Sequence, residues 1–471
     1  MASTLSHNPE TRYGSVLAEL GRLALPLGIA QLASIGIMTA DVVMMGQLSA
    51  FDLAAGSLAV RLYQPFYFFA LGLLSVISAL VAQSLGADQP EMARRVFRQG
   101  LLLSVMMGGL FMIPVLGGEH LMVMLGQSPA IAAQAKEYLF WSALGLPASL
   151  VFLTMRFFTM GHGRAGPQLL ATFIGLAFNL IANPVLANGL GGLPALGLGG
   201  IALATTLTYF VMCLSLGLII ALNAPFAASQ PYRRWWVPDL SLIRQIFRIG
   251  WPNGFLVMSE TGMFAVAAFL IGLFGAAPLA AAGITNQIAA MTFMIPLSVA
   301  QACVIKVGRA AGAGNPGDVR RYGNGGIWLG CLLAMPLGLI IWLFDEQLGY
   351  LFIRPDDVMS GQTIALIIPM LWITALFQLG DSLQAIITAS LRGLNDTRVP
   401  AFYGFLCFWI ISLGGGVLMA FLLDWGPVAV WAGLGLGLTL NAAILMVRWW
   451  RRLHQIETGK TNLLNVSVNS N

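Results

Sequence analysis

Charged residues are scarce in this sequence. Asp, Glu, Lys and Arg together make up only 9% of its 471 residues. A water-soluble domain carries roughly 25% charged residues, so this chain has too little polar surface to cover a soluble globule. It has instead 58% hydrophobic residues, 54 glycines and a mean hydropathy of +0.81. The composition predicts an integral membrane protein, for which a net charge of +5 is no sign of nucleic-acid binding; we expect no nucleic-acid partner.

Cysteine and histidine are also rare, and the sequence lacks the usual catalytic motifs. Cysteine occurs at four positions: Cys213, Cys303, Cys331 and Cys407. All four lie in apolar runs without metal-ligand or redox spacing, which is typical of small core residues. The four histidines fall in predicted loops or tails, away from any GxSxG motif. The chain is therefore not expected to be an enzyme or to hold a cofactor.

Motifs for two other classes of membrane protein are missing as well. The nearest match to a phosphate-binding loop, Gly459-Lys460-Thr461, has His454 where the first glycine belongs and follows no predicted strand. This excludes an ATP-driven pump of that type. A channel needs a selectivity filter or a ring of charges, and neither is visible. An aspartyl intramembrane protease that uses two of the buried acids described below stays formally open.

Long apolar runs fill the chain from end to end. A membrane-spanning helix needs about 20 mostly apolar residues, so this length accommodates about a dozen. Hydropathy and turn residues predict spans at 22–48, 53–85, 92–117, 130–160, 165–188, 195–224, 240–274, 279–312, 317–345, 360–393, 398–423 and 427–455. The first thirteen residues are polar and no small-residue cleavage site follows, so we expect no removable signal peptide.

The basic residues indicate the orientation. If both ends of the chain are cytoplasmic, only Arg61, Lys136 and Arg354 of the 24 basic residues fall on the outer side. Cytoplasmic loops of membrane proteins carry an excess of Lys and Arg. We therefore expect a multi-pass protein with both termini in the cytoplasm.

The chain repeats itself. Shifting it by 226 residues aligns 15–100 with 241–326 without a gap, with 18 identities in 86 positions. The identities include prolines, glycines and loop arginines at Pro26/Pro252, Gly28/Gly254, Gly36/Gly262, Gly46/Gly272, Gly86/Gly312, Pro90/Pro316, Arg94/Arg320 and Arg95/Arg321. Six spans separate the copies, an even number, so the repeats run parallel.

The repeat defines the predicted domains. They are an N-lobe at 1–228, a cytoplasmic linker at 229–240, a C-lobe at 241–455 and a cytoplasmic tail at 456–471. The predicted fold is thus all-α, with twelve transmembrane helices in two parallel six-helix repeats. In membrane proteins built this way, substrates bind near the interface of the repeats and rocking of one against the other gives alternating access. This organisation favours a transporter.

Three acids lie well inside predicted spans: Asp41, Glu260 and Asp381. Each opposes membrane insertion by roughly 2.5 to 3.5 kcal/mol at the helix centre, so such residues are retained when they are paired, protonated or used. At the 226-residue offset Glu260 falls opposite Ser34, and Asp41 opposite Ala267, so the lobes place their acids differently. An interhelical hydrogen bond from a protonated acid is the structural alternative for any one of them.

Few basic residues are deep enough to pair with these acids. The candidates are Arg61, Arg156 and Lys306, and the last two lie near predicted cytoplasmic ends, where their side chains are expected to snorkel toward water. At least two of the acids are therefore expected to lack a fixed basic partner. A carboxylate in that position serves as a proton acceptor or as a ligand for a cation.

Amides accompany two of the acids. Asn179 and Asn183 lie one turn apart, just before the kink expected at Pro184, and are expected to line a cavity with Asp41. Hydrogen bonding between helices is the alternative. In the tenth span Gln378 and Gln384 flank Asp381 at three-residue spacing, which makes one polar stripe. Such a stripe is expected to face protein or water rather than lipid.

Several segments resemble one known family, the multidrug and toxic compound extrusion (MATE) transporters, and most closely their NorM-type bacterial branch. The segments are MTADVVMMGQLSAFDLAAGSLA, VAQSLGADQPEMARRVFRQG, WPNGFLVMSETGMF, AAAGITNQIAAMTFMIPLSVAQACVIKVGRAAGAG and FQLGDSLQAIITASLRGLNDTRVP. The likeness covers nearly the whole chain. It implies a V-shaped, two-lobe antiporter of the bacterial inner membrane, expected to act as a monomer, that contributes to drug resistance by exporting cationic, amphipathic compounds in exchange for Na⁺ or H⁺.

The resemblance also implies roles for the buried polar residues. Glu260 and Asp381 are similar to the family's second-lobe cation site, with Na⁺ as one possible ligand, and Gln378 and Gln384 support it. Asp41, Asn179 and Asn183 are similar to its first-lobe substrate or proton cluster. Phe293 and Phe377 stand where some relatives have tyrosine, which leaves the choice of ion open. The alternative function is a flippase for lipids or lipid-linked oligosaccharides with a related two-lobe fold, which would need a basic cavity.

Overall fold

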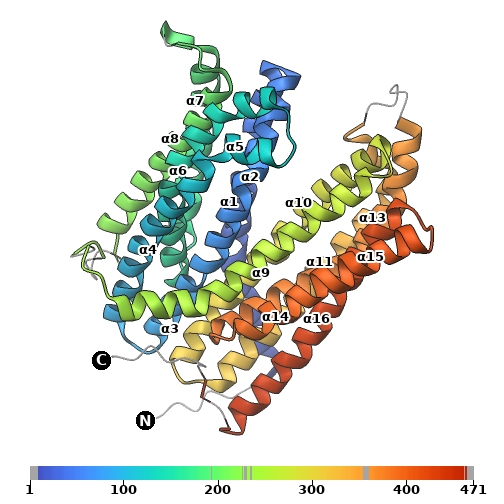
Figure 1. Cartoon of the computed structure of the whole chain (residues 1–471). Coiled ribbons are helices and arrows are strands. Elements are labelled where there is room, and N and C mark those ends of the chain that lie inside the picture. The colour runs from blue at the N-terminus through green and yellow to red at the C-terminus, as the bar shows by residue number, and fades with distance from the viewer. Residues whose placement is uncertain are drawn as a thin grey trace, which may run out of the picture. The chain divides into compact units, whose positions relative to one another are not determined.

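The structure is a computed structural model and is all-helical in the part it describes (Figure 1). The described residues are 9–192, 194–224, 226, 231–233, 236–353, 360–460 and 462–463. Arg354, residues 229–230 and 234–235 of the predicted linker and most of the predicted tail lie outside them. The lobe boundaries themselves stay a prediction.

Twelve helices in the described part are long and apolar enough to span a membrane, as predicted. They are α1 (Pro9–Leu48), α2 (Ala50–Leu74) continued by α3 (Val76–Gly86), α4 (Pro90–Leu116), α6 (Pro129–Gly161), α7 (Gly166–Asn188), α8 (Gly197–Leu222), α9 (Leu240–Gly272), α10 (Ala276–Gly312), α11 (Pro316–Leu343), α13 (Ser360–Gly393), the run α14 (Arg398–Phe405), η3 (Leu406–Gly414), α15 (Gly415–Val417) and η4 (Leu418–Leu422), and α16 (Pro427–Glu457). The short elements α5 (Gly118–Met124), η1 (Leu190–Gly192) and α12 (Asp345–Tyr350) lie in connections. The first span begins well before the predicted residue 22, because its polar first turns are also helical.

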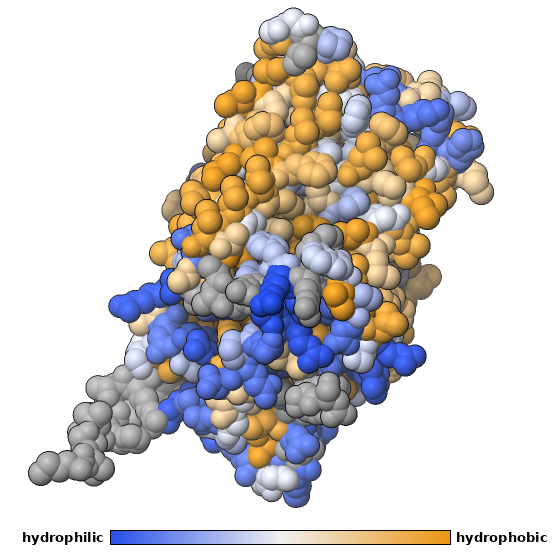
Figure 2. All heavy atoms as spheres, turned by 90° about the vertical axis from the view of Figure 1, so that its left-hand side faces the viewer, coloured by the Kyte–Doolittle hydropathy of each residue, from blue (hydrophilic) through white to orange (hydrophobic). Residues whose placement is uncertain are grey.

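The surface agrees with a membrane environment. Figure 2 shows one face of the molecule, where apolar side chains dominate a broad area and hydrophilic side chains gather toward one end. Large apolar side chains such as Leu110, Ile113 and Leu214 are more than 60% exposed. A contiguous apolar surface of this kind is rare on soluble monomers. Lipid is the solvent that this surface fits.

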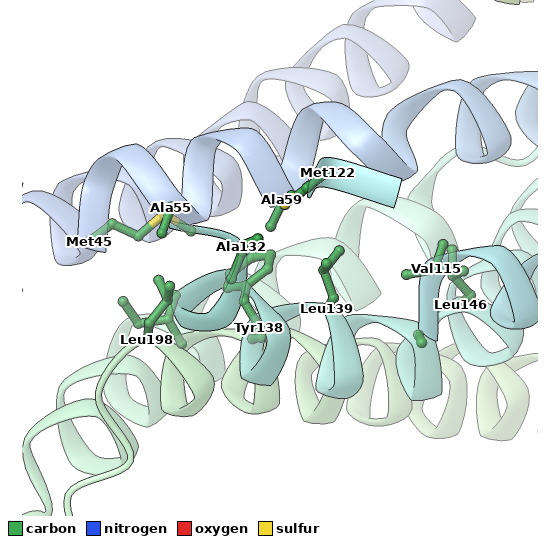
Figure 3. Packing of buried hydrophobic residues seen from close by; sticks show 14 of the residues in the cluster. Met45, Ala55, Ala59, Val115, Met122, Ala132, Tyr138, Leu139, Leu146 and Leu198 are labelled. Carbon is green, nitrogen blue, oxygen red and sulfur yellow. The ribbon is translucent and has the colours of Figure 1, made fainter. Parts of the chain in front are cut away.

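The helices form two compact units. One comprises residues 29–261 and is called the N-unit here; the other comprises residues 1–28 and 262–471 and is called the C-unit. The N-unit core packs α2, α6 and α8 around Ala59, Leu139 and Leu198 (Figure 3). The C-unit has its own core, in which Val307, Leu391 and Trp449 are buried.

Two helices, α1 and α9, are divided between the units. The first part of each helix packs in one unit, and the rest of that helix packs in the other. The first part of α1 packs in the C-unit, where the Glu19 carboxylate lies 2.6 Å from the Lys306 ammonium and accepts a hydrogen bond from Tyr322 at 3.0 Å. The first part of α9 packs in the N-unit, where Asp239 just before the helix lies 2.6 Å from the Arg95 guanidinium. The two first helices of the repeats are thus shared in the same way.

Glycines make corresponding close approaches in the two units. In the C-unit a Cβ built on Gly28 would lie 3.3 Å from Ser298 Oγ, and in the N-unit a Cβ on Gly72 would lie 2.7 Å from the Cα of Gly254. Residues 28 and 298 correspond to 254 and 72 at the offset of 226. The internal repeat seen in the sequence is therefore a repeat of tertiary contacts as well.

Candidate functional site

Asp41 lies in α1 within a group of neutral hydrogen-bond donors, and this group is called the Asp41 cluster. Asn183 Nδ2 donates to Asp41 Oδ1 at 2.8 Å, and Asn179 Nδ2 donates to the same oxygen at 3.3 Å. Thr205 Oγ1, from α8, donates to Oδ2 at 2.6 Å. The carboxylate is 7% exposed and forms no ion pair with any described residue.

The sequence of α7 explains how the two amides reach Asp41. Asn179 and Asn183 are four residues apart and so share one face of the helix. Asn183 also donates to Asn179 Oδ1 at 3.2 Å, which orients both amides toward the carboxylate. Pro184 lacks an N–H, so it leaves the carbonyl of Leu180 without its usual helical donor. Asp41, Asn179 and Asn183 thus form one cluster, while their role in binding stays a prediction.

Thr205 was missed by the sequence analysis. Thr205 is one of three threonines in α8, with Thr206 and Thr208, and nothing in the sequence distinguishes it from them, because threonine in a helix often bonds only to a backbone carbonyl. Thr205 instead donates across the helix contact to Asp41, and its hydroxyl also accepts from Asn179 Nδ2 at 3.3 Å. It completes the set of donors around the acid.

Asp381 lies in α13 of the C-unit and has fewer partners. Its carboxylate interacts with the Gln384 amide, but its Oδ1 is buried and has no hydrogen-bond partner in the described part of the chain. The residue is 7% exposed and pairs with no described basic residue. A buried carboxylate oxygen without a donor is rare and calls for an explanation, such as an ion that binds there.

Other polar groups surround the stripe that includes Asp381, and together they are called the Asp381 cluster. Gln384 Oε1 accepts from Asn441 Nδ2 of α16 at 2.9 Å, and Gln378 Oε1 lies 3.5 Å from Thr292 Oγ1 of α10. Gln378 Nε2 and Asn441 Oδ1 are buried without a partner among the described residues. Polar groups of α10 and α16 therefore contact the polar stripe of α13, and sequence analysis had missed Asn441 and Thr292.

Glu260 lies in α9, partly buried, and belongs to the N-unit, whereas Asp381 belongs to the C-unit. The pairing of these two acids at one cation site thus stays a prediction. Among the described residues there is no group of three His, Cys, Asp or Glu side chains of the kind that holds a metal ion. A cation at Asp381 would have to use amide, hydroxyl and backbone oxygens in addition to the carboxylate.

The basic candidates do not pair with Asp41 or Asp381. Lys306 pairs with Glu19, and Arg61 is exposed on α2. Arg156 does not snorkel, contrary to the expectation: it is only 8% exposed, five residues before the end of α6 at Gly161. The prediction was wrong because nearness to a helix end says nothing about the side chains that pack around that end.

Known proteins match this chain closely. The MatE family model matches residues 26–185 and 252–418, and these segments begin 226 residues apart, at the offset of the internal repeat. The probable multidrug resistance protein NorM of Bradyrhizobium diazoefficiens is 34% identical over 95% of this chain and 98% of its own length. Its counterpart in Rhizobium meliloti is 35% identical over 92% of this chain and 94% of its own length.

The fold agrees with solved structures. The crystal structure of the eukaryotic MATE transporter AtDTX14 superposes with a TM-score of 0.83 over 95% of this chain and 100% of that chain, at 18% identity. An outward-facing MATE transporter of the MOP superfamily gives 0.85 over 94% of this chain and 97% of that chain, at 20% identity. At these identities the likeness concerns the fold alone. On the sequence matches, this multi-pass membrane protein belongs to the MatE family, a family of transporters rather than enzymes.

Proposed function

We propose that this protein is a secondary active multidrug exporter, which couples the efflux of cationic, amphipathic compounds to the entry of Na⁺ or H⁺ across the bacterial inner membrane. The observation that carries the proposal is Asp381 Oδ1, a carboxylate oxygen buried in a membrane helix without a partner in the described residues. An uncompensated acid in this environment is functional by default. The relatives are named multidrug resistance proteins, which supports the substrate class.

The proposed cycle uses the acids as the exchange point. A cation from outside binds at Asp381 and Glu260 and lowers the affinity for the drug, which leaves to the outside. After the cation is released inside, Asp381 and Glu260 favour the drug again. A ligand shifts a conformational equilibrium only by its different affinity for the two states, so the coupling energy must come from the cation contacts at these acids. Both termini are taken to be cytoplasmic in this scheme.

The test uses purified protein in proteoliposomes with a sodium gradient or a proton gradient imposed separately, and ethidium as the transported compound. Wild type is expected to respond to one gradient. Asp381→Asn and Glu260→Gln are expected to lose gradient-driven transport. Asp424→Asn is the matched control, because Asp424 is an exposed loop acid with a positive φ of 54° that asparagine also tolerates. Wild-type transport in both acid variants would rule out the mechanism.

A lipid or oligosaccharide flippase is the alternative, and one observation favours it: the buried Arg156, a cation that an anionic headgroup would satisfy. The described membrane acids Asp41, Glu260 and Asp381 speak for cationic substrates instead. Binding of a lipid pyrophosphate, with no binding of organic cations, would reverse the ranking.

A further inference from the structure

Arg156 is a buried cation that the proposed function does not use. Its Nε is buried without a hydrogen-bond partner, and the side chain forms no ion pair with any residue that the structure describes. Removing a charge from water without a compensating partner is unfavourable. Arg156 and Asp381 are alike in being buried charges without an ion-pair partner among the described residues. If a cation compensates Asp381, an anion is the group that would compensate Arg156.

Two tyrosines neighbour this guanidinium. Tyr67 of α2 and Tyr209 of α8 are its ionisable neighbours, and their hydroxyls are close enough to share a hydrogen bond. Both tyrosines keep part of their surface accessible, whereas Arg156 keeps only 8%. Phenol hydroxyls donate hydrogen bonds to an anion, and phenol rings pack against an aromatic ligand. A ligand that reaches Arg156 thus meets donors and an apolar surface together.

The tyrosine group extends toward the Asp41 cluster. Tyr63 lies one helical turn from Tyr67 on α2, interacts with the hydroxyl of Tyr138 on α6 and has Asp41 as a charged neighbour. Tyr209 likewise has Asp41 among its charged neighbours. The N-unit therefore has both a carboxylate and a guanidinium as neighbours of one group of tyrosines, whereas Asp381 in the C-unit forms no ion pair with a described basic residue.

We propose that Arg156, together with Tyr67 and Tyr209, binds the anionic group of a transported amphiphile and so determines which charged forms the N-unit accepts. This proposal rests on the exporter function and adds a second determinant to it. A carboxylate is the group that best fits a planar guanidinium, with which it forms two parallel hydrogen bonds. A lipid phosphate offers the same chemistry, and the experiment separates the two sources.

The experiment compares two ligands that differ only in this group: an aromatic amine with a free carboxylate, and its methyl ester. Binding is measured on purified protein in nanodiscs of neutral phosphatidylcholine. Arg156→Gln is expected to weaken binding of the acid on the order of tenfold and to leave the ester unchanged, because a hydrogen bond to a charged group is lost only for the acid. Arg156→Lys keeps the positive charge but cannot form two parallel hydrogen bonds to a carboxylate. It is expected to bind the acid more tightly than Arg156→Gln but more weakly than wild type.

The control is Arg61→Gln, which removes an exposed arginine from α2 in the same unit and should alter neither ligand. Unchanged binding of the ester shows that Arg156→Gln is folded. An equal loss of both ligands, or an unchanged acid, overturns the proposal. Adding anionic phosphatidylglycerol identifies the source: if it competes with the acid in wild type but not in Arg156→Gln, lipid phosphate uses the same site. Loss of gradient-driven transport in Asp381→Asn tests the exporter function separately.

Discussion

Asp41 in the N-unit and Asp381 in the C-unit are equally buried, each 7% exposed, yet their surroundings differ. Asp41 accepts hydrogen bonds on both oxygens from two amides and a hydroxyl. Asp381 interacts with one amide and keeps one oxygen without a partner in the described part of the chain. Neutral donors can replace water around a carboxylate without a counter-ion. Asp41 thus belongs to a preformed set of donors, whereas Asp381 has one oxygen that no described donor satisfies.

The largest effect expected from this comparison concerns the coupling ion. Asp381→Asn should abolish the release of Na⁺ or H⁺ that accompanies drug binding, a loss of at least about tenfold in released ion, since the substituted amide has no negative charge to hold a cation. Asp41→Asn should keep most of the release. The measurement is drug titration in weakly buffered solution with a proton indicator, and in parallel with radioactive sodium. A larger loss in Asp41→Asn would invert the assignment.

The related glycine contacts of the two units should differ in how well they tolerate a methyl group. Gly72→Ala should destabilise the protein by about 1–3 kcal/mol, because the new Cβ would lie 2.6 Å from the backbone oxygen of Asn253, which cannot rotate away. Gly28→Ala, at the related contact, meets the Ser298 hydroxyl at 3.3 Å and should have a smaller effect. Thermal unfolding in detergent measures both. Equal shifts in Tm would show that the two contacts are equally tight.

A third prediction concerns stability at the two acids. Asp41→Asn should destabilise by about 1–3 kcal/mol, because the new amide N–H₂ faces donors from Asn183 or Thr205 and leaves one of them unsatisfied. Asp381→Asn should be neutral or stabilising, since it removes a buried charge that lacks full compensation. Chemical unfolding of both variants in the same detergent gives the difference. A stabilised Asp41→Asn would contradict it.

The smallest expected effect is at the start of α9. The Ser241 hydroxyl and the Arg95 guanidinium hold the pKa of Asp239 below its ordinary value. This contribution to stability is present above the ordinary carboxyl pKa and is lost as the pH falls through the lowered value. Because the pair is partly exposed, Asp239→Asn should cost less than about 1 kcal/mol at pH 7. The difference from wild type should shrink at strongly acidic pH, which thermal unfolding across pH can follow.

Much of the fold could be predicted from the sequence, because hydropathy reports directly on burial in lipid. The twelve spans are confirmed to within a few residues at most ends, and the repeat explains the matching contacts of Gly28 and Gly72. The sharing of α1 and α9 between units could not be predicted, since a helix pattern does not say which neighbours each half packs against. The first part of α1 contacts Lys306 and Tyr322 through Glu19, and these residues lie 287 and 303 positions further along the chain.

The candidate site was predictable where periodicity carried the signal. Asn179 and Asn183 stand one turn apart, and Gln378 and Gln384 recur around Asp381, so their shared faces followed from spacing. Single polar residues on other helices gave no such signal. Thr205 and Asn441 therefore emerged only from the tertiary contacts.

Because α1 and α9 are each divided between the units, cutting the chain between the two sequence repeats would not separate the two units. A fragment ending at residue 228 would lack 240–261, which complete the N-unit, and would carry 1–28, which belong to the other unit. A fragment that begins at residue 229 would lack 1–28, which belong to the C-unit, and would carry 240–261, which belong to the N-unit. Neither fragment encodes a self-sufficient unit, so each would have to borrow a helix from the other in order to fold, much as strands are exchanged between domain-swapped subunits.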